Sequence, residues 1–309
     1  MRTVYLGTSA FAAGVLRRLH DSPHRPSLVI TRPDRPRGRG RALGAPPVAE
    51  AARALGVALL QPDSVNAPDT LERIRAEAPG SVCVCAYGAL LREPLLSDFL
   101  LLNVHPSLLP RWRGAAPVER AIDAGDEQTG VTIMRPEAEL DAGPICLQAR
   151  EPIHPDDDYG ALAARLEAVS GDLLVAALDA TPDCRPQPAE GVTLAPKIRP
   201  EDRRLDPARP AAALARRVRA LTPHIGAWVE LPGGERLGVL RAAADDGSEA
   251  LARGELREVV GRLLLGCAAG VLELVDVRPA GGRPMPADAW LRGHGAGLTR
   301  PGPRPGVQG

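Results

Sequence analysis

The 309-residue sequence has little lysine, few aromatic side chains and no long apolar runs. Lys197 is the only lysine, so arginine carries almost all of the positive charge, a preference that we attribute to codon bias. Aromatic residues make up 3% of the chain, which leaves Leu, Val and Ala to fill the cores. No apolar run approaches the ~20 residues that a membrane-spanning helix needs, and the amino terminus lacks the basic region of a signal peptide. We therefore expect a cytoplasmic protein with no membrane partner.

Charge balance and cysteine spacing argue against two further classes of protein. Basic and acidic residues number 38 each, so no global electrostatic field draws the chain toward nucleic acid, and any basic site is local. The five cysteines include no CxxC pair, so they indicate neither a disulfide framework nor a metal site. Cys83 and Cys85 lie two residues apart in an apolar run, so we expect both to be buried on one strand face.

Short β-branched runs alternate with helical periods from residue 3 to about residue 178. Helices are expected over 10–20 and 159–178, because each segment has one apolar stripe. This alternation is typical of βαβ units, and it predicts an α/β fold with a Rossmann-like parallel sheet. The expected strands are Val4 to Leu6, Leu28 to Thr31, Val57 to Leu60, Val82 to Cys85, Leu101 to His105 and Val131 to Met134.

A proline-rich segment divides the chain. Seven prolines lie between residues 181 and 210, a density that favours extended, semi-rigid backbone. Length also favours two domains, because one core tends to split beyond ~250–300 residues. A helix over 211–221, followed by short strands separated by glycine-containing turns, indicates a small β-barrel of OB-like type. We expect a catalytic domain at 1–180, a linker at 181–210, the barrel at 211–292 and a disordered tail at 293–309.

Polar side chains follow two of the expected strands. Asn103 and His105 lie two residues apart at the end of one strand, so they share a face. Asp141 follows the strand at 131–134 and precedes a turn at Gly143 that can bring its carboxylate to the same place. Ligands bind at strand ends in open parallel sheets. An imidazole, an amide donor and a carboxylate together suit acyl transfer, which needs a deprotonated amine and a donor for the oxyanion.

Spacing alone leaves a plainer interpretation open. Asn and His at a strand end are more often turn-forming or structural residues, and an Asp close to a Gly is often only part of a turn. These three residues by themselves do not distinguish the chemical interpretation from the structural one.

A longer motif favours the chemical interpretation. The run NVHPSLLPRWRGAAPVERAI at 103–122 resembles the signature of folate-dependent formyltransferases, in which N-x-H, S-L-L-P and a later Asp form the active site. Its portion RWRGAAP at 111–117 resembles the branch that acts on methionyl-tRNA more than the glycinamide ribonucleotide or aminosugar branches. Further matching blocks are TRPDRPRGRGR at 31–41, TGVTIM at 129–134 and APKI at 195–198.

The resemblance implies 10-formyltetrahydrofolate as the formyl donor, initiator methionyl-tRNA as the acceptor, and no metal. It makes Asn103, His105 and Asp141 the catalytic residues. As a hypothesis, His105 helps to deprotonate the amine, Asn103 holds the developing oxyanion, and Asp141 orients His105 and relays protons. The resemblance also assigns folate binding to a short run of residues, Ser107, Leu108, Leu109 and Pro110.

A basic segment at 32–41 is the first candidate for tRNA contact. It holds five arginines against one acid, interleaved with Gly and Pro that forbid a helix. A charge run is usually only a solvated surface, but this one leaves the strand at 28–31 on the side where the active site is expected to open. We expect phosphate contacts from Arg37, Arg39 and Arg41, with Arg39 foremost because it fills the family's Gly-Arg-Gly position.

The second domain is mildly basic as well. From residue 204 to residue 309, fifteen arginines face eleven acidic residues, and Arg216, Arg217 and Arg219 are candidates to line a groove near the linker. Two other functions stay open: a folate formyltransferase for a nucleotide-linked amine or aminosugar, and a non-catalytic tRNA-binding protein that kept the fold. We expect a monomer, because no unused apolar stripe is obvious.

Overall fold

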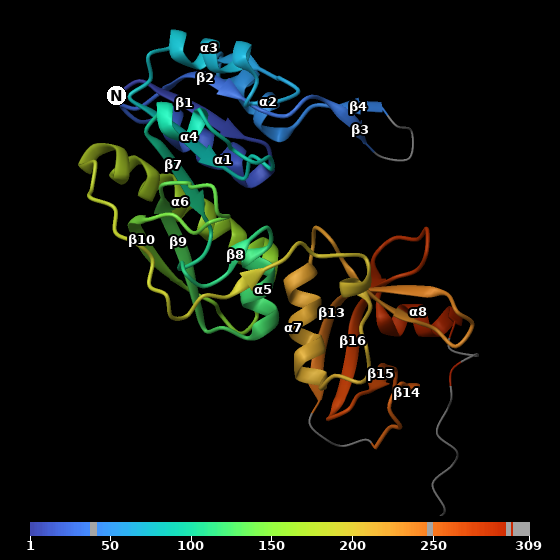
Figure 1. The fold of residues 1–309 in the computed structure, drawn as a ribbon. Coiled ribbons are helices and arrows are strands. Elements are labelled where there is room, and N and C mark those ends of the chain that lie inside the picture. The colour runs from blue at the N-terminus through green and yellow to red at the C-terminus, as the bar shows by residue number, and fades with distance from the viewer. Residues whose placement is uncertain (38–41, 246–249, 295–297, 299–309) are drawn as a thin grey trace, which may run out of the picture. The chain divides into compact units, whose positions relative to one another are not determined.

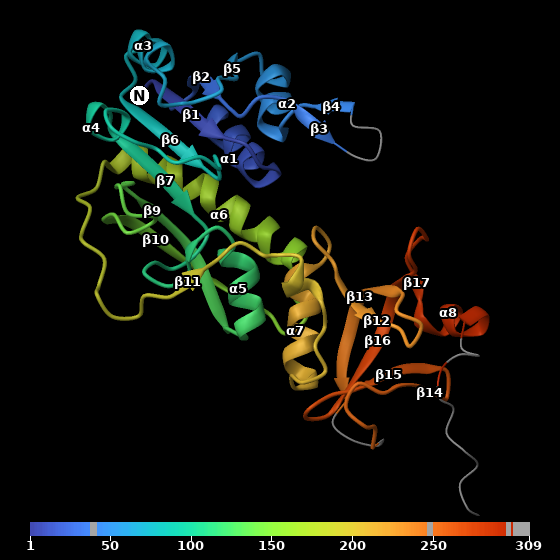
Figure 2. The same ribbon diagram turned by 45° about the vertical axis from the view of Figure 1, so that its right-hand side comes forward.

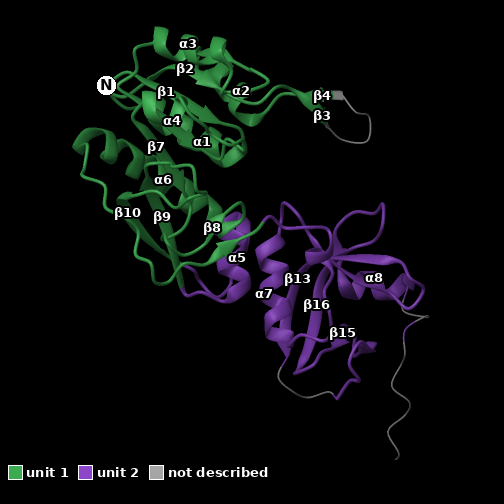
Figure 3. Ribbon diagram, in the orientation of Figure 1, with its two compact units in different colours: residues 1–117, 128–152, 163–196 green, residues 118–127, 153–162, 197–309 purple. Residues whose placement is uncertain are grey.

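The computed structural model describes residues 1–37, 42–245, 250–294 and 298. These residues form two compact units, each with its own sheet (Figures 1 and 3). Unit 1 comprises residues 1–117, 128–152 and 163–196, and unit 2 comprises residues 118–127, 153–162 and 197–309.

Seven strands form the main sheet of unit 1, in the order β10-β9-β7-β6-β1-β2-β5 (Figure 2). The five strands from β5 to β7 run parallel, which confirms the predicted α/β sheet. The remaining two form an antiparallel edge: β9 runs opposite to β7, and β10 runs opposite to β9. The loop between β9 and β10 is too short for the crossover that parallel neighbours need. The bounds are β1 Thr3–Gly7, β2 Pro26–Ile30, β5 Ala58–Leu60, β6 Ser81–Cys85, β7 Leu101–His105, β9 Gln128–Met134 and β10 Ile145–Pro152.

Helices pack on this sheet, and the two that the periodicity predicted are confirmed. The hydroxyl of Ser9 caps α1 by accepting from the Ala12 N–H at 3.2 Å, and the carboxylate of Asp158 caps α6 by accepting from the Ala161 N–H at 2.8 Å. The helices of unit 1 are α1 Ala10–His20, α2 Pro47–Ala54, α3 Pro68–Ala76 and α4 Leu95–Asp98. All of α5 Pro117–Ala124 except its first residue belongs to unit 2, and the long α6 Tyr159–Ala180 begins in unit 2 and ends in unit 1.

Side chains alternate between the two faces of the sheet. Val4 and Leu6 of β1 join the core cluster that includes Leu71 and Ile74 of α3, whereas Tyr5 points the other way and donates to the Ala12 carbonyl at 2.6 Å. Cys83 and Cys85 are fully buried, as predicted, and burial raises the pKa of each thiol to about 12. Both thiols are therefore part of the core.

Cys146 and Cys184 form a disulfide, contrary to the expectation from cysteine spacing. Ile145 and Arg185 exchange backbone hydrogen bonds of 2.7 and 2.8 Å, so the adjacent residues face each other as a non-hydrogen-bonded pair, with Cα atoms 4.0 Å apart. The two cysteines are 38 residues apart in the sequence. Only the folded chain brings the segment after α6 beside β10, so spacing alone carried no signal of the pair.

The arginine-rich segment forms a hairpin of β3 Arg35–Arg37 and β4 Ala42–Gly44 after the end of β2 (Figure 1). Arg35 pairs with Gly44, so the described flanks of the basic segment pair as two short strands. Arg39 and Arg41 lie outside the described residues, and of Arg37 only the backbone is described.

Unit 2 contains the predicted barrel-like domain. Its antiparallel sheet has the order β12-β13-β16-β15-β14, and β17 pairs with β16. The predicted helix at 211–221 is confirmed as α7, and its Leu214, Val218 and Leu221 are buried in the core of this domain. The helix α8 extends to His294, and residues 295–297 and 299–309 of the expected tail lie outside the described residues. The bounds are η1 Glu201–Arg203, α7 Ala211–Leu221, β12 Ala227–Glu230, β13 Arg236–Asp245, β14 Leu256–Val259, β15 Arg262–Gly266, β16 Val271–Arg278, β17 Met285–Pro286 and α8 Ala287–His294.

The three arginines of α7 are held by groups of unit 2 itself. Arg217 makes two 2.7 Å hydrogen bonds to the Asp123 carboxylate, and Arg216 donates to the Asp123 carbonyl at 3.3 Å. Arg219 donates to the Asp157 carbonyl at 2.7 Å. All three arginines that were candidates to line a groove are thus hydrogen-bonded to groups of unit 2. Among the described residues, no helix is long and apolar enough to cross a membrane.

Candidate active site

Asn103 and His105 lie on the inner strand β7, at the strand end that the sequence indicated. Asn103 is opposite Met134 of β9, and His105 is opposite Thr132. The His105 side chain is 6% exposed, whereas Asn103 is half-buried. Within the described residues, the Asn103 amide has no hydrogen-bond partner. Both side chains share one face of the sheet, and the amide has donors free for a ligand.

The His105 ring is held by the chain that returns after β7. Its Nε2 lies 2.9 Å from the Trp112 carbonyl oxygen. A carbonyl only accepts hydrogen bonds, so this contact puts the proton of the neutral ring on Nε2 and leaves a lone pair on Nδ1. Trp112 has a left-handed backbone with φ of 65°, which belongs to the tight return of this segment. The structure thus selects the ring nitrogen that can accept a proton.

Asp141 lies beside that nitrogen. Its Oδ2 is 3.6 Å from His105 Nδ1 and accepts the Gly114 N–H at 2.9 Å. Because β9 is antiparallel to β7, the loop that carries Asp141 starts beside Asn103 and folds back toward His105, a path that the sequence did not reveal. Asp141 has φ of 51°, in the left-handed region that Asp tolerates better than most residues.

The segment from Ser107 to Pro110 is tied to the sheet through its own polar groups. The Ser107 hydroxyl is fully buried and donates to the Arg111 carbonyl at 2.6 Å. The Thr132 hydroxyl donates to the Ser107 carbonyl at 2.7 Å and accepts the Leu109 N–H at 3.1 Å. Leu109 is buried, while Leu108 and Pro110 are half-buried. The polar groups of Ser107 therefore hold the loop in shape, and Leu108 and Pro110 are the members of this run with accessible side chains.

Two residues of the proline-rich segment complete the support of the site, and sequence reasoning missed both. Thr193 accepts the Trp112 N–H on its hydroxyl at 2.8 Å and the Arg113 N–H on its carbonyl at 2.9 Å. Gln187 hydrogen-bonds to the loop of Asp141 and to Arg113. The pairing of β8 Arg113–Gly114 with β11 Leu194–Ala195 joins the same segments. A polar residue in a presumed linker carries no sequence signal that would mark it.

Gly114 needs to be glycine at this junction. Its φ is 123°, and a Cβ added there would lie 2.7 Å from the Ala195 carbonyl oxygen. The glycine lets β8 approach β11 while its N–H points at the Asp141 carboxylate. One signal in the sequence pointed to the contact between Gly114 and Asp141: Gly114 belongs to the motif that follows the expected active-site residues.

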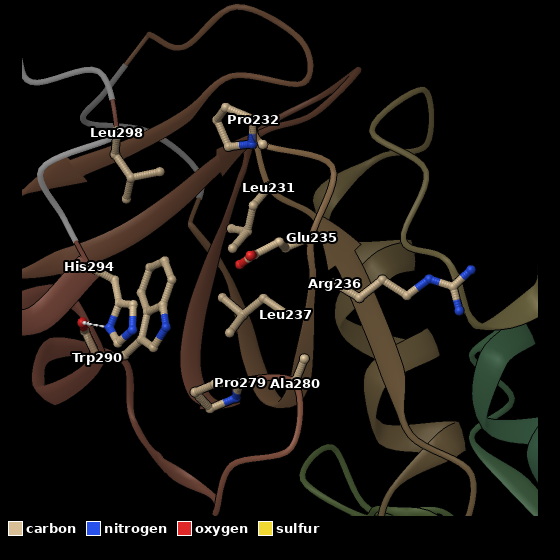
Figure 4. A pocket seen from close by; sticks show the side chains of 11 residues that line it. Leu231, Pro232, Glu235, Arg236, Leu237, Pro279, Ala280, Trp290, His294 and Leu298 are labelled. Carbon is tan, nitrogen blue, oxygen red and sulfur yellow. Dashed lines mark hydrogen bonds between the residues drawn. The ribbon is translucent and has the colours of Figure 1, made fainter.

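A separate pocket of about 500 Å³ lies wholly in unit 2 (Figure 4). Leu231 and Leu237 line it together with Trp290, which stacks on His294 at 5.3 Å between ring centroids. It contains none of the candidate catalytic residues, and its lining is mostly apolar. This pocket is therefore separate from the cluster of candidate residues at the end of β7.

The fold and the polar cluster together define a class of protein. An open α/β sheet that brings an imidazole lone pair, a carboxylate and a free amide to one strand is built for transfer of an acyl group to a nucleophile. A family model described as formyl transferase matches residues 1–178, and one described as formyl transferase, C-terminal domain, matches residues 197–295. The chain belongs to the formyl transferase family.

Similar proteins include methionyl-tRNA formyltransferases from several bacteria. The one from a Nocardioides species is 45% identical over 300 residues, which are 95% of this chain and 95% of that protein. The one from Halorhodospira halophila is 44% identical over 95% of this chain and 97% of that protein. Among solved structures, HypX from Aquifex aeolicus in complex with tetrahydrofolic acid has a TM-score of 0.65 and 18% identity, and matches all of this chain and 50% of that chain. This last similarity concerns the fold alone.

Proposed function

We propose that this chain transfers the formyl group of 10-formyltetrahydrofolate to the α-amino group of initiator methionyl-tRNA. The observation that carries the proposal is the approach of Asp141 to the proton-accepting nitrogen of His105, 3.6 Å away. It occurs in a chain that is similar over nearly its whole length to proteins named methionyl-tRNA formyltransferase. The Asn103, His105 and Asp141 trio is part of this proposal.

His105 takes the proton from the attacking amine at Nδ1. The Asp141 carboxylate stabilises the imidazolium that this transfer creates, and Gly114 keeps the carboxylate in place. Asn103 donates a hydrogen bond to the formyl oxygen, which gains negative charge as the carbon–nitrogen bond to methionine forms. The bond from the formyl carbon to the folate nitrogen then breaks, and that nitrogen receives the proton from His105.

The residues around the trio fit a folate. A pterin ring has an apolar face and polar edges, so its site needs both apolar surface and hydrogen-bond donors. Leu140, next to Asp141 in the sequence, is 59% exposed. This leucine and the half-buried Leu108 and Pro110 supply apolar surface, and the Asn103 amide supplies donors. The folate brings the activated formyl group, and the residues of the chain orient this group and transfer the protons.

The basic hairpin is the proposed contact for tRNA phosphates. Arg35 is exposed on β3, and the segment continues through Arg37 to Arg39 and Arg41. The hairpin follows the carboxyl end of β2, whose neighbours in the sheet are β1 and β5, so it belongs to the edge of the sheet where parallel strands end. Guanidinium groups there would hold an acceptor stem by its backbone without reading its sequence.

We further propose that the protein acts as a monomer in the cytoplasm. Charged tRNA for translation initiation is used there, which supports the location. Only seven large hydrophobic side chains among the described residues are exposed: Met1, Leu43, Leu90, Leu140, Val192, Leu194 and Val260. This small number supports the monomer, and a single species of monomeric mass in sedimentation velocity would agree with it.

One transfer assay tests the proposed function. The protein is incubated with formyl-labelled 10-formyltetrahydrofolate and, in parallel, with initiator methionyl-tRNA, elongator methionyl-tRNA, glycinamide ribonucleotide or an amino-sugar nucleotide. Label should move to initiator methionyl-tRNA, and His105→Ala should lower that rate by about 100-fold or more. Transfer only to a small amine would overturn the choice of acceptor. Full activity of Asn103→Ala and His105→Ala together would overturn the assignment of the site.

A further inference from the structure

The first half of the proline-rich segment belongs to unit 1 and is attached to the rest of that unit at three places. The disulfide to Cys146 holds Cys184, and the backbone pair with Ile145 holds Arg185. Further along, β11 pairs with β8. Gln187 lies between these attachments, so its backbone is fixed on both sides beside the loop that carries Asp141. This segment is a support for the site as well as a connection.

All the hydrogen-bonding groups of the Gln187 side chain are used. Its Nε2 donates to the Asp141 carbonyl at 2.7 Å and to the Gly143 carbonyl at 2.8 Å. Its Oε1 accepts from Arg113 Nε at 3.0 Å and from Arg113 Nη2 at 2.8 Å. An amide has two N–H donors and an oxygen with two lone pairs, so these four bonds satisfy it completely. Neither a carboxylate nor a shorter side chain can reproduce the pattern.

The four bonds join both elements that aim the Asp141 carboxylate. One element is the loop itself, held at the Asp141 and Gly143 carbonyls while the backbone of Asp141 is in the left-handed region. The other is β8, where Arg113 precedes the Gly114 N–H that binds Asp141 Oδ2. Backbone in this region is costly for a residue with a Cβ and persists only where its surroundings hold it. Gln187 provides that restraint.

We propose that Gln187 is a positioning residue for formyl transfer, which fixes the Asp141 carboxylate against the His105 ring by clamping the Asp141 loop to β8. This inference rests on the proposed roles of His105 and Asp141. Gln187 acts through Asp141 and has no part in the proton transfer itself. Loss of the clamp lets the loop relax, and displacements near 1 Å at a reacting group cost up to about 100-fold in rate.

Three variants test the clamp in the full chain. Gln187→Ala removes all four bonds. Gln187→Glu keeps the size of the side chain and the pairing with Arg113, but turns an acceptor toward the Asp141 and Gly143 carbonyls. Gln128→Ala is the matched control, because Gln128 is an exposed glutamine on β9 whose side chain accepts only from Arg150. Steady-state kcat, the KM for each substrate and the thermal midpoint are measured for all of them.

We expect kcat to fall by about 10- to 100-fold in both Gln187 variants, with each KM within about threefold of the starting protein and the control unchanged. Retention of kcat within twofold in Gln187→Ala would overturn the proposal. A rise in KM with kcat intact would do the same, since it would place Gln187 in substrate binding.

A double-mutant cycle with Asp141→Ala, measured under single-turnover conditions, separates positioning from general support. If Gln187 acts through Asp141, Gln187→Ala has no further effect on the rate once the carboxylate is gone. Equal losses in both backgrounds would overturn the proposal. Full activity of Asp141→Ala alone would instead remove the proposed role of Asp141 on which the inference rests, so the two failures are distinguishable.

Discussion

Two carboxylates, Asp141 of unit 1 and Asp123 of unit 2, are held in different ways. In unit 1 the Asp141 carboxylate and the His105 ring are held by single main-chain groups, Gly114 N–H and Trp112 carbonyl, and face each other across 3.6 Å. In unit 2 the Asp123 carboxylate is bound twice by Arg217 at 2.7 Å. A carboxylate with its oxygens paired stabilises the fold. A carboxylate held by a single backbone N–H can still accept hydrogen bonds from a ligand. The number of hydrogen-bond partners therefore distinguishes a functional carboxylate from a structural one.

Replacing Asp141 by Asn is expected to produce the largest effect. The amide oxygen can still accept from Gly114, so the shape of the loop is preserved while the negative charge beside His105 is lost. We expect kcat to fall by about 100- to 1,000-fold, with little change in thermal stability. Measuring kcat and the thermal midpoint on the same preparation checks this. A large drop in the midpoint would show that Asp141, like Asp123, is mainly structural.

Replacing Asp123 by Ala is the converse experiment in unit 2. It leaves the Arg217 guanidinium, 13% exposed, without its carboxylate. Breaking such a pair should lower the free energy of unfolding by about 3 kcal/mol, while kcat per folded molecule stays near its starting value. Urea denaturation combined with the transfer assay gives both quantities. Loss of activity without loss of stability would contradict the comparison.

Replacing Arg39 tests whether an arginine of the basic hairpin contributes to tRNA binding in a way that an arginine already in an ion pair does not. We expect Arg39→Ala to raise the KM for methionyl-tRNA by about tenfold at low salt, because a phosphate contact is lost, and to lower kcat modestly. The control is Arg241→Ala, which removes an exposed arginine already paired with Asp276 at 2.7 Å. Initial rates over a range of tRNA and salt concentrations make the measurement. Equal KM values for the two variants would remove the hairpin from tRNA binding.

The smallest expected effect concerns Asp202 of unit 2. Burial alone would raise the pKa of Asp202, but the Arg199 N–H and the Arg120 guanidinium outweigh it and leave the pKa below its ordinary value. A depressed folded-state pKa contributes stability that is present above the unfolded-state value, near ~3.9, and is lost as pH falls through the folded-state value. Asp202→Asn should therefore lower the thermal midpoint by a few degrees at pH 7, with the difference shrinking below about pH 4.

The sequence predicted the strands that carry the site, because period and β-branched content are local properties. It also indicated the Asn103–His105 pair, since a two-residue spacing on a strand fixes a common face. The antiparallel direction of β9 and the return of the Asp141 loop were not predictable, because they depend on pairing between distant segments. Gln187 and the Cys146–Cys184 pair were missed for the same reason: Gln187 and Cys184 lie in a proline-rich stretch that composition alone describes as a spacer, and their partners are distant in the sequence.

The contact between His105 Nε2 and the Trp112 carbonyl decides from which side the ring can take a proton. With that edge of the ring closed, the attacking amine must approach on the Nδ1 side, next to the Asp141 carboxylate. A single main-chain oxygen thereby sets the direction from which the acceptor has to be presented to the formyl carbon.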